Sequence, residues 1–154
     1  MRLTFVTGEV TVVILQSGRG SAGSKSEALS TKGATILVAE DDQGLRKLIK
    51  AILAPAGYDL VVASDGDEAV DLGYENRECL VLAVLDAVMP LRRGVDTMKA
   101  LRAFCPDLPV LLISGYSAED FLQELDERTR FLRKPFTSSQ LLEAVRQSLG
   151  VVET

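Results

Sequence analysis

A run of six apolar residues ending in a single acid constrains this chain more than any other feature. Residues 80–85 read Leu-Val-Leu-Ala-Val-Leu, Asp86 follows directly, and Pro90 comes four positions later. Such a run between polar flanks is typical of a strand buried on both faces of a parallel sheet. Proline lacks the N–H of a ladder hydrogen bond, so the chain must leave the sheet near residue 90. The sequence therefore predicts Asp86 at a strand's carboxyl end, where open α/β sheets bind ligands. A turn or helix-capping aspartate is the alternative.

Four more apolar runs of strand length alternate with stretches of helical periodicity. Strands are predicted at 35–39, 58–63, 80–85, 109–113 and 130–133. Apolar residues at helical spacing predict helices at 43–53, at about 66–75, before Pro106, in a short segment after Ser117, and after Thr137. Five strands alternating with five helices predict an α/β fold, a doubly wound five-stranded parallel sheet with helices on both faces.

Short polar motifs mark where several of these helices begin. Asp42 is expected to cap the first helix rather than to bind a ligand. The pairs Asp65 with Glu68 and Thr137 with Gln140 have the spacing of a capping box, in which side chain and backbone bond reciprocally. The pair Ser117 and Asp120 is expected to cap the short fourth helix in a similar way.

Composition excludes several classes of function. The chain has no histidine, which removes Ser-His-Asp and Cys-His catalysis, imidazole metal ligation and any phosphohistidine. Cys79 and Cys105 form no CxxC pair, so buried thiols in a reducing compartment are expected. The net charge of −5 argues against nonspecific binding to nucleic acid or to anionic membranes.

The first 33 residues differ in composition from the rest. Residues 10–15 are β-branched and apolar, but residues 16–33 are rich in Gly, Ser and charge, as in flexible linkers. We therefore expect a flexible tail or linker at 1–33 and a single domain at 34–150. No apolar stretch is long enough to span a membrane, and no signal peptide is apparent, so a cytoplasmic protein is expected.

Chemically capable side chains follow four of the predicted strands. Their carboxyl ends carry Glu40 with Asp41, then Asp86, Ser114 and Lys134. In a doubly wound sheet these ends converge on one crevice. Clustered carboxylates repel one another and are costly to desolvate unless a cation compensates, and Mg²⁺ suits carboxylates, water and a phosphoryl group. The sequence therefore predicts a site that places a phosphoryl group on a carboxylate.

Four motifs in order resemble the receiver domain of two-component response regulators. They are Ile36-Leu-Val-Ala-Glu-Asp-Asp42, Asp86-x-x-Met-Pro90, Ile113-Ser-Gly-Tyr116 and Lys134-Pro-Phe136. The resemblance covers about residues 34–150 and implies a flavodoxin-like sheet of order 2-1-3-4-5. It also implies a signalling domain, not an enzyme, that takes a phosphoryl group from a sensor histidine kinase or phosphotransfer protein in the presence of Mg²⁺.

The resemblance also implies a role for each site residue. Asp86 resembles the phosphoacceptor and a Mg²⁺ ligand, Ser114 the switch hydroxyl, and Lys134 the lysine that contacts the phosphoryl group. The other metal ligands implied are Asp41, the backbone carbonyl of Val88, and Glu40 through water. Phe131 resembles the aromatic switch residue, with packing in the core as its alternative.

Two departures from the family's pattern bear on the lifetime of the phosphoryl group. Val88 supplies no carboxamide to orient an attacking water, and Tyr116 places a bulky ring nearby. We therefore expect slow self-dephosphorylation.

Other functions stay open on the sequence alone. They are the C-terminal receiver of a hybrid histidine kinase, an aspartate-nucleophile phosphatase, and a pseudo-receiver that only binds partners.

Overall fold

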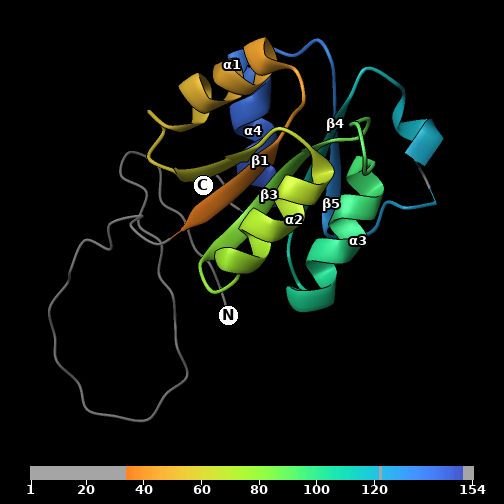
Figure 1. Ribbon diagram of the computed structural model, residues 1–154. Helices are drawn as coiled ribbons and strands as arrows, with labels where there is room; N and C mark the ends of the chain where they lie inside the picture. Colours follow the sequence, from red (N-terminus) through yellow and green to blue (C-terminus); the bar gives the residue numbers. More distant parts are fainter. Residues whose placement is uncertain (1–33, 122, 151–154) are drawn as a thin grey trace, which may run out of the picture.

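The computed structural model describes residues 34–121 and 123–150 (Figure 1). Strands and helices alternate along these residues, and within them none of the helices is long and apolar enough to cross a membrane. The predicted tail at 1–33 lies outside the described residues, so that boundary stays a prediction. The elements are β1 (Thr35–Ala39), α1 (Gln43–Leu53), β2 (Asp59–Ala63), α2 (Gly66–Glu75), β3 (Leu80–Asp86), α3 (Gly94–Phe104), β4 (Val110–Ser114), the 3₁₀ helix η1 (Ala118–Phe121), β5 (Thr129–Arg133) and α4 (Ser138–Ser148).

The five strands form one parallel sheet in the order β2-β1-β3-β4-β5, as expected. Ala39 at the end of β1 pairs with Ala63 of β2 and with Leu85 of β3, so the three strands end at one edge. Asp86 pairs with Ile113 of β4, one residue before the strand ends. The register therefore brings the polar residues that follow β1, β3, β4 and β5 to the same edge of the sheet.

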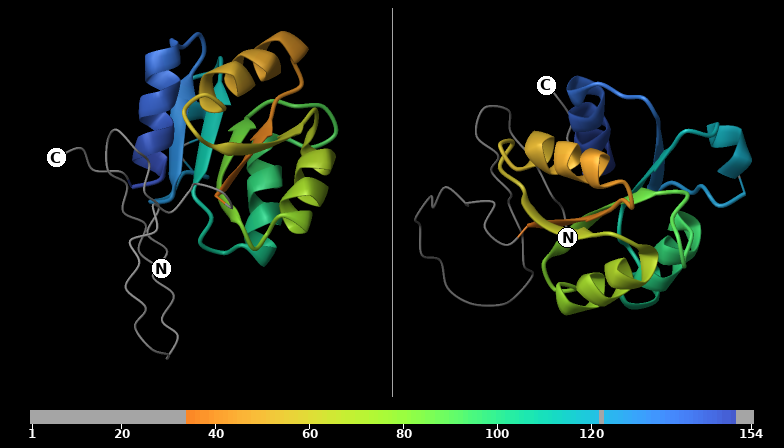
Figure 2. Two further views of the ribbon diagram at one scale, coloured as in Figure 1. Left: turned by 90° about the vertical axis from the view of Figure 1, so that its left-hand side faces the viewer. Right: turned by 45° about the horizontal axis from the view of Figure 1, so that its top comes forward.

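Helices cover both faces of this sheet (Figure 2). Helices α1 and α4 lie on one face, and α2 and α3 lie on the other. Strand residues alternate between the two sides, as the pleat requires: Ile36 and Val38 pack with α1 and α4, whereas Leu37 and Ala39 pack with α2 and α3. Because both faces are covered, the central strands are almost completely buried, which explains their continuous apolar sequence.

Three helices begin with the side-chain caps expected from the sequence. The Asp42 carboxylate accepts a hydrogen bond from the Leu45 N–H at 2.7 Å, and Thr137 forms a complete capping box with Gln140. Asp65 accepts from the Glu68 N–H. The reciprocal bond that a capping box requires, from the Asp65 N–H to the Glu68 carboxylate, does not form, so that part of the prediction is wrong. The Glu68 carboxylate instead accepts from the N–H and hydroxyl of the preceding residue, Ser64, and so ties the end of β2 to α2.

The predicted short helix after Ser117 is present, but among the described residues it is a single 3₁₀ turn, Ala118–Phe121, and not an α-helix. Ser117 donates to the Asp120 carboxylate from its N–H and hydroxyl, which is one half of the predicted cap; the Asp120 N–H donates to the Ser117 carbonyl and not to its side chain. The segment before β5 carries five acids within nine residues, 119–127. Like charges at helical spacing repel one another, and short helices depend on packing for their stability. An α-helix in this segment would therefore gain little stabilisation, which explains why the turn is short.

We predict that Gly94→Ala destabilises the fold by about 1–3 kcal/mol, because a side chain at residue 94 would overpack the contact between α3 and β3. A Cβ atom there would meet the carbonyl oxygen of Asp86 and lie 2.8 Å from Ala87 Cα. The matched control is Gly115→Ala, whose Cβ would meet nothing within 4 Å. Chemical denaturation of the two variants measures the difference, and equal stabilities would contradict this account of Gly94.

Candidate functional site

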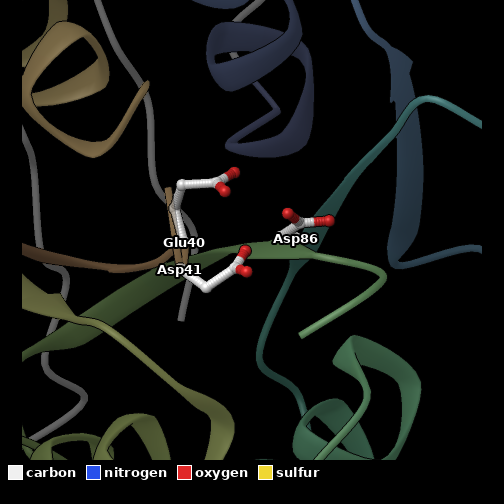
Figure 3. A group of neighbouring side chains, drawn as sticks. All are labelled: Glu40, Asp41 and Asp86. Carbon is white, nitrogen blue, oxygen red and sulfur yellow. The ribbon is translucent and has the colours of Figure 1, made fainter. Parts of the chain in front are cut away.

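Three acids meet at the carboxyl edge of the sheet (Figure 3). Glu40 and Asp41 follow β1, Asp86 ends β3, and one carboxylate oxygen from each lies within 4.8 Å of the others. Glu40 and Asp86 are buried, with 1% and 6% of their surface exposed, whereas Asp41 is exposed. The structure thus brings together the three acids that the sequence placed at one crevice, and their carboxylates face one shared space.

Lys134 brings a positive charge to this cluster from the end of β5. Its Nζ atom lies 2.9 Å from Asp86 Oδ2 and 3.1 Å from Glu40 Oε2. Burial by itself would lower the pKa of Lys134, but the hydrogen bond to Asp86 and the two nearby carboxylates outweigh it and raise that pKa above its ordinary value. The lysine is therefore charged at neutral pH and offsets part of the repulsion between the acids.

Glu40 is the acid most affected by its surroundings. Burial raises its pKa from 4.5 to about 7, and the charge of Asp86 acts in the same direction. Two groups lower this pKa in part. They are the Asp42 N–H, which donates to Glu40 Oε1 at 3.1 Å, and the Lys134 ammonium. The second oxygen, Oε2, is buried without a hydrogen-bond partner among the described residues, although it forms the ion pair with Lys134. A carboxylate oxygen with this single neighbour still has a lone pair available to a further ligand.

Ser114 ends β4 beside these charged groups and is 1% exposed. Its hydroxyl oxygen accepts a hydrogen bond from the Tyr116 N–H at 3.1 Å, and its carbonyl accepts from the Lys134 N–H at 2.8 Å. The hydroxyl therefore connects the edge of the sheet to the loop that precedes η1. A group that drew this hydroxyl toward Asp86 would compete with the bond to Tyr116.

The remaining predicted site residues lie around this edge. The Val88 N–H donates to Asp86 Oδ1 at 3.0 Å, and metal ligation by the Val88 carbonyl stays a prediction. Phe131 is half-buried on β5, where its ring lies 5.9 Å from that of Phe121 in η1. This contact links β5 to the loop after β4, and the switch role of Phe131 stays a prediction.

Two residues that shape the site escaped the sequence analysis. Gly94, at the start of α3, lets that helix pack against the backbone of Asp86. Arg46, on α1, donates from its guanidinium to the carbonyl oxygens of Glu40 and Asp41. An arginine on an amphipathic helix usually faces solvent, so its position in the sequence carried no signal of this contact.

The donor set suits a hard divalent cation. It consists of carboxylate oxygens, the ligands that Mg²⁺ and Ca²⁺ prefer, and it contains no thiol or imidazole. One lysine and three carboxylates leave the cluster with an excess of negative charge, which a further cation would offset. The residues present therefore fit an ion such as Mg²⁺.

A family model for the response regulator receiver domain matches residues 36–146. The chain belongs to this family. Over 116 residues the chain is 34% identical to the transcriptional regulatory protein CpxR of Escherichia coli K12. The aligned region covers 74% of the chain and 48% of CpxR. The chain is 33% identical over 118 residues to the sensor kinase CckA of Brucella abortus, which covers 75% of the chain and 12% of CckA. The chain thus spans about half the length of CpxR, and much less of CckA.

Solved structures agree with this assignment of the receiver domain. A response regulator receiver protein from Sinorhizobium medicae WSM419 superposes with a TM-score of 0.70 at 29% identity, covering 76% of this chain and 94% of that one. The receiver domain from the hybrid histidine kinase CckA gives 0.66 at 32% identity, covering 75% and 98%. The fold and the family predicted from the sequence are therefore confirmed.

We predict that the free energy of unfolding of the metal-free receiver domain falls as pH rises from 4.5 through about 7, the interval over which Glu40 titrates. A raised pKa means that the folded state holds its proton more tightly than the unfolded state, so stability is lost when the carboxyl ionises. The loss is on the order of 3 kcal/mol. Denaturant unfolding across this range measures it.

Two comparisons isolate the contribution of Glu40 to this pH profile. Glu40→Gln removes the titrating group and should flatten the profile, and added Mg²⁺ should flatten it by stabilising the ionised carboxylate. Lys134 does not contribute in this window, because its raised pKa affects stability only at alkaline pH. A wild-type profile that is flat or rises with pH would contradict the prediction.

Proposed function

We propose that the Asp86 carboxylate accepts a phosphoryl group from a phosphohistidine on a sensor histidine kinase or phosphotransfer protein, with Mg²⁺ bound beside it. One observation carries the proposal: Asp86 is buried at a strand end with two further acids within 4.8 Å and the Lys134 ammonium at 2.9 Å. A divalent ion held by Asp41, Asp86 and the Val88 carbonyl, with Glu40 contacting it through water, would neutralise charge on the incoming phosphoryl oxygens.

The proposed transfer is a simple displacement. The bond between phosphorus and the donor nitrogen breaks as a bond to an Asp86 oxygen forms, and the nitrogen keeps the electron pair. The imidazole leaves as a neutral ring because its other nitrogen carries the proton. The protein's part is to position the groups: Val88 orients the Asp86 carboxylate, and Lys134 supplies positive charge where the phosphoryl oxygens arrive.

We infer that phosphorylation is passed on through the loop after β4. The new dianion would attract the Ser114 hydroxyl, which now accepts from the Tyr116 N–H. Movement of this loop and η1 would disturb the packing of Phe121 against Phe131. The face formed by η1, β5 and α4 would therefore change shape, which is a signalling output and needs no turnover of a small substrate.

The surroundings of Asp86 support a protein as phosphodonor. Within the described ranges, three of the five exposed large apolar side chains lie in the loops after β3 and β4, namely Val88, Leu91 and Tyr116. A protein surface that brings its histidine to Asp86 would cover them, and exposed apolar side chains of this kind are often buried in contacts between proteins. Kinases of this kind are charged from ATP, so we expect the domain to act in the cytoplasm.

We propose that residues 34–150 form the receiver unit. This unit could belong to either of two kinds of protein. Similarity to CckA favours a receiver attached to a kinase, whereas similarity to CpxR favours a regulator that receives the phosphoryl group from a separate protein. In either setting the chemistry at Asp86 is the same.

We predict that Asp86→Asn abolishes phosphorylation, because the amide cannot form an acyl phosphate. Purified protein is incubated with Mg²⁺ and acetyl phosphate or phosphoramidate, and its intact mass is measured. Wild type should gain the mass of one phosphoryl group. Asp71→Asn, a substitution on the exposed surface of α2, is the matched control and should be labelled as wild type is.

Other outcomes of this labelling would contradict the proposal. Labelling of Asp86→Asn at wild-type levels would show that another residue is the acceptor. Sustained turnover of a phosphomonoester would favour an aspartate-nucleophile phosphatase, and absence of labelling by both phosphodonors and by a charged histidine kinase would favour a pseudo-receiver.

We predict that Val88→Asn shortens the lifetime of the phosphoryl group by roughly tenfold, because a carboxamide beside Asp86 can orient an attacking water. Val88 is 52% exposed, so the substitution is accommodated without repacking the core. Val88→Leu is the matched control, since leucine has the shape of asparagine without its amide. The decay of labelled protein after donor removal measures the effect. Wild-type decay within seconds would contradict the slow hydrolysis expected from Val88 and Tyr116.

A further inference from the structure

One arginine on α1 holds the backbone from which two of the site's acids emerge. Arg46 Nη1 donates to the Glu40 carbonyl oxygen at 2.7 Å and to the Asp41 carbonyl oxygen at 3.2 Å. The Arg46 backbone N–H donates to the next carbonyl, that of Asp42, at 2.9 Å. Three successive carbonyls of the β1–α1 loop therefore accept hydrogen bonds from the same residue.

This loop sets the direction of the Asp41 carboxylate. Glu40 Oε1 has its own hydrogen bond, from the Asp42 N–H, and its Oε2 is paired with Lys134. No other described residue forms a hydrogen bond or ion pair with the exposed Asp41 carboxylate, so its orientation depends on the backbone that carries it. Without Arg46, the Glu40 and Asp41 carbonyls would lose these hydrogen bonds. The Asp42 N–H would still bond to Glu40 Oε1, but the loop would be held less firmly and the Asp41 oxygen would be less well fixed beside Asp86.

The contacts of Arg46 distinguish this role from an electrostatic one. Among the described residues its guanidinium forms no ion pair with Glu40, Asp41 or Asp86, and both of its side-chain hydrogen bonds go to backbone carbonyls. A positive charge near the site can only repel an incoming cation. If charge were its only effect, removing Arg46 would strengthen cation binding, whereas loss of positioning would weaken it.

We propose that Arg46 is a positioning residue for the divalent cation, because it orders the β1–α1 loop so that the Asp41 carboxylate points at the space beside Asp86. This inference rests on the proposed function of the site, and it names a residue outside the acid, hydroxyl and lysine set. Arginine suits the task better than lysine, because its planar, rigid guanidinium is pre-organised for bonding to fixed acceptors.

The test compares Mg²⁺ affinity in Arg46→Met and Arg46→Lys with that of wild type by isothermal titration calorimetry. Residues that orient metal ligands typically alter affinity by 10–100-fold, so we expect Arg46→Met to bind Mg²⁺ at least about tenfold more weakly. Arg46→Lys keeps the charge but can bond only one carbonyl well. Its Mg²⁺ affinity should therefore fall between those of wild type and Arg46→Met.

Lys47→Met is the matched control, because it removes an exposed positive charge from the neighbouring position of α1. We expect it to leave Mg²⁺ affinity unchanged or slightly stronger. Urea unfolding of each variant, with Mg²⁺ and without it, shows that the binding measurements are made on folded protein. Labelling of Arg46→Met by acetyl phosphate should recover toward the wild-type rate at saturating Mg²⁺, because the acceptor itself is intact.

The possible results separate this inference from the proposal on which it rests. Tighter Mg²⁺ binding by Arg46→Met, with Arg46→Lys unchanged, would show that Arg46 acts only through its charge and would overturn the inference. Equal Mg²⁺ affinities with lowered stability would overturn it in favour of a structural role. Failure of wild type itself to bind Mg²⁺ would instead overturn the proposed metal site, and the inference with it.

Discussion

The repulsion between carboxylates at the edge of the sheet is the constraint on which the site depends. Glu40 and Asp86 are both buried within a few ångströms of Asp41, an arrangement that costs free energy unless positive charge is close by. Lys134 supplies one such charge and contacts both buried acids. The cost that remains is visible in Glu40, whose pKa is raised to about 7. A site in this condition favours the binding of a cation, because added positive charge offsets the repulsion that remains.

The rest of the structure holds these charges in place. The parallel register aligns the ends of β1 and β3, and β5 brings Lys134 from the far side of β4. Gly94 allows α3 to press against the backbone of Asp86, while Arg46 secures the loop after β1. Neither residue touches the space between the carboxylates. Both act on the backbone from which the reactive groups project, which is where rigid support is most effective.

Much of this arrangement could be predicted from the sequence, because the signals are local. The buried strands have apolar runs, and Asp42 and Thr137 stand at the positions of helix caps. Each of these elements can therefore be recognised from a few neighbouring residues. The length and type of the short helix after Ser117 could not be predicted, for the opposite reason. The sequence has apolar residues at helical spacing between 121 and 125, but the described residues of this segment form only the 3₁₀ turn Ala118–Phe121. Spacing alone does not reveal how little packing a charged segment will gain.

The sequence by itself determined the kind of fold, the strand-end position of Asp86 and the chemical character of the site. These follow from patterns within a few residues and from the rule that parallel strands end at a common edge. Only the tertiary structure decided which groups interact: that Lys134 contacts both Glu40 and Asp86, that the Ser114 hydroxyl bonds Tyr116, and that Arg46 turns back to the loop before it. Such contacts depend on register, crossover and side-chain direction, which no local pattern records.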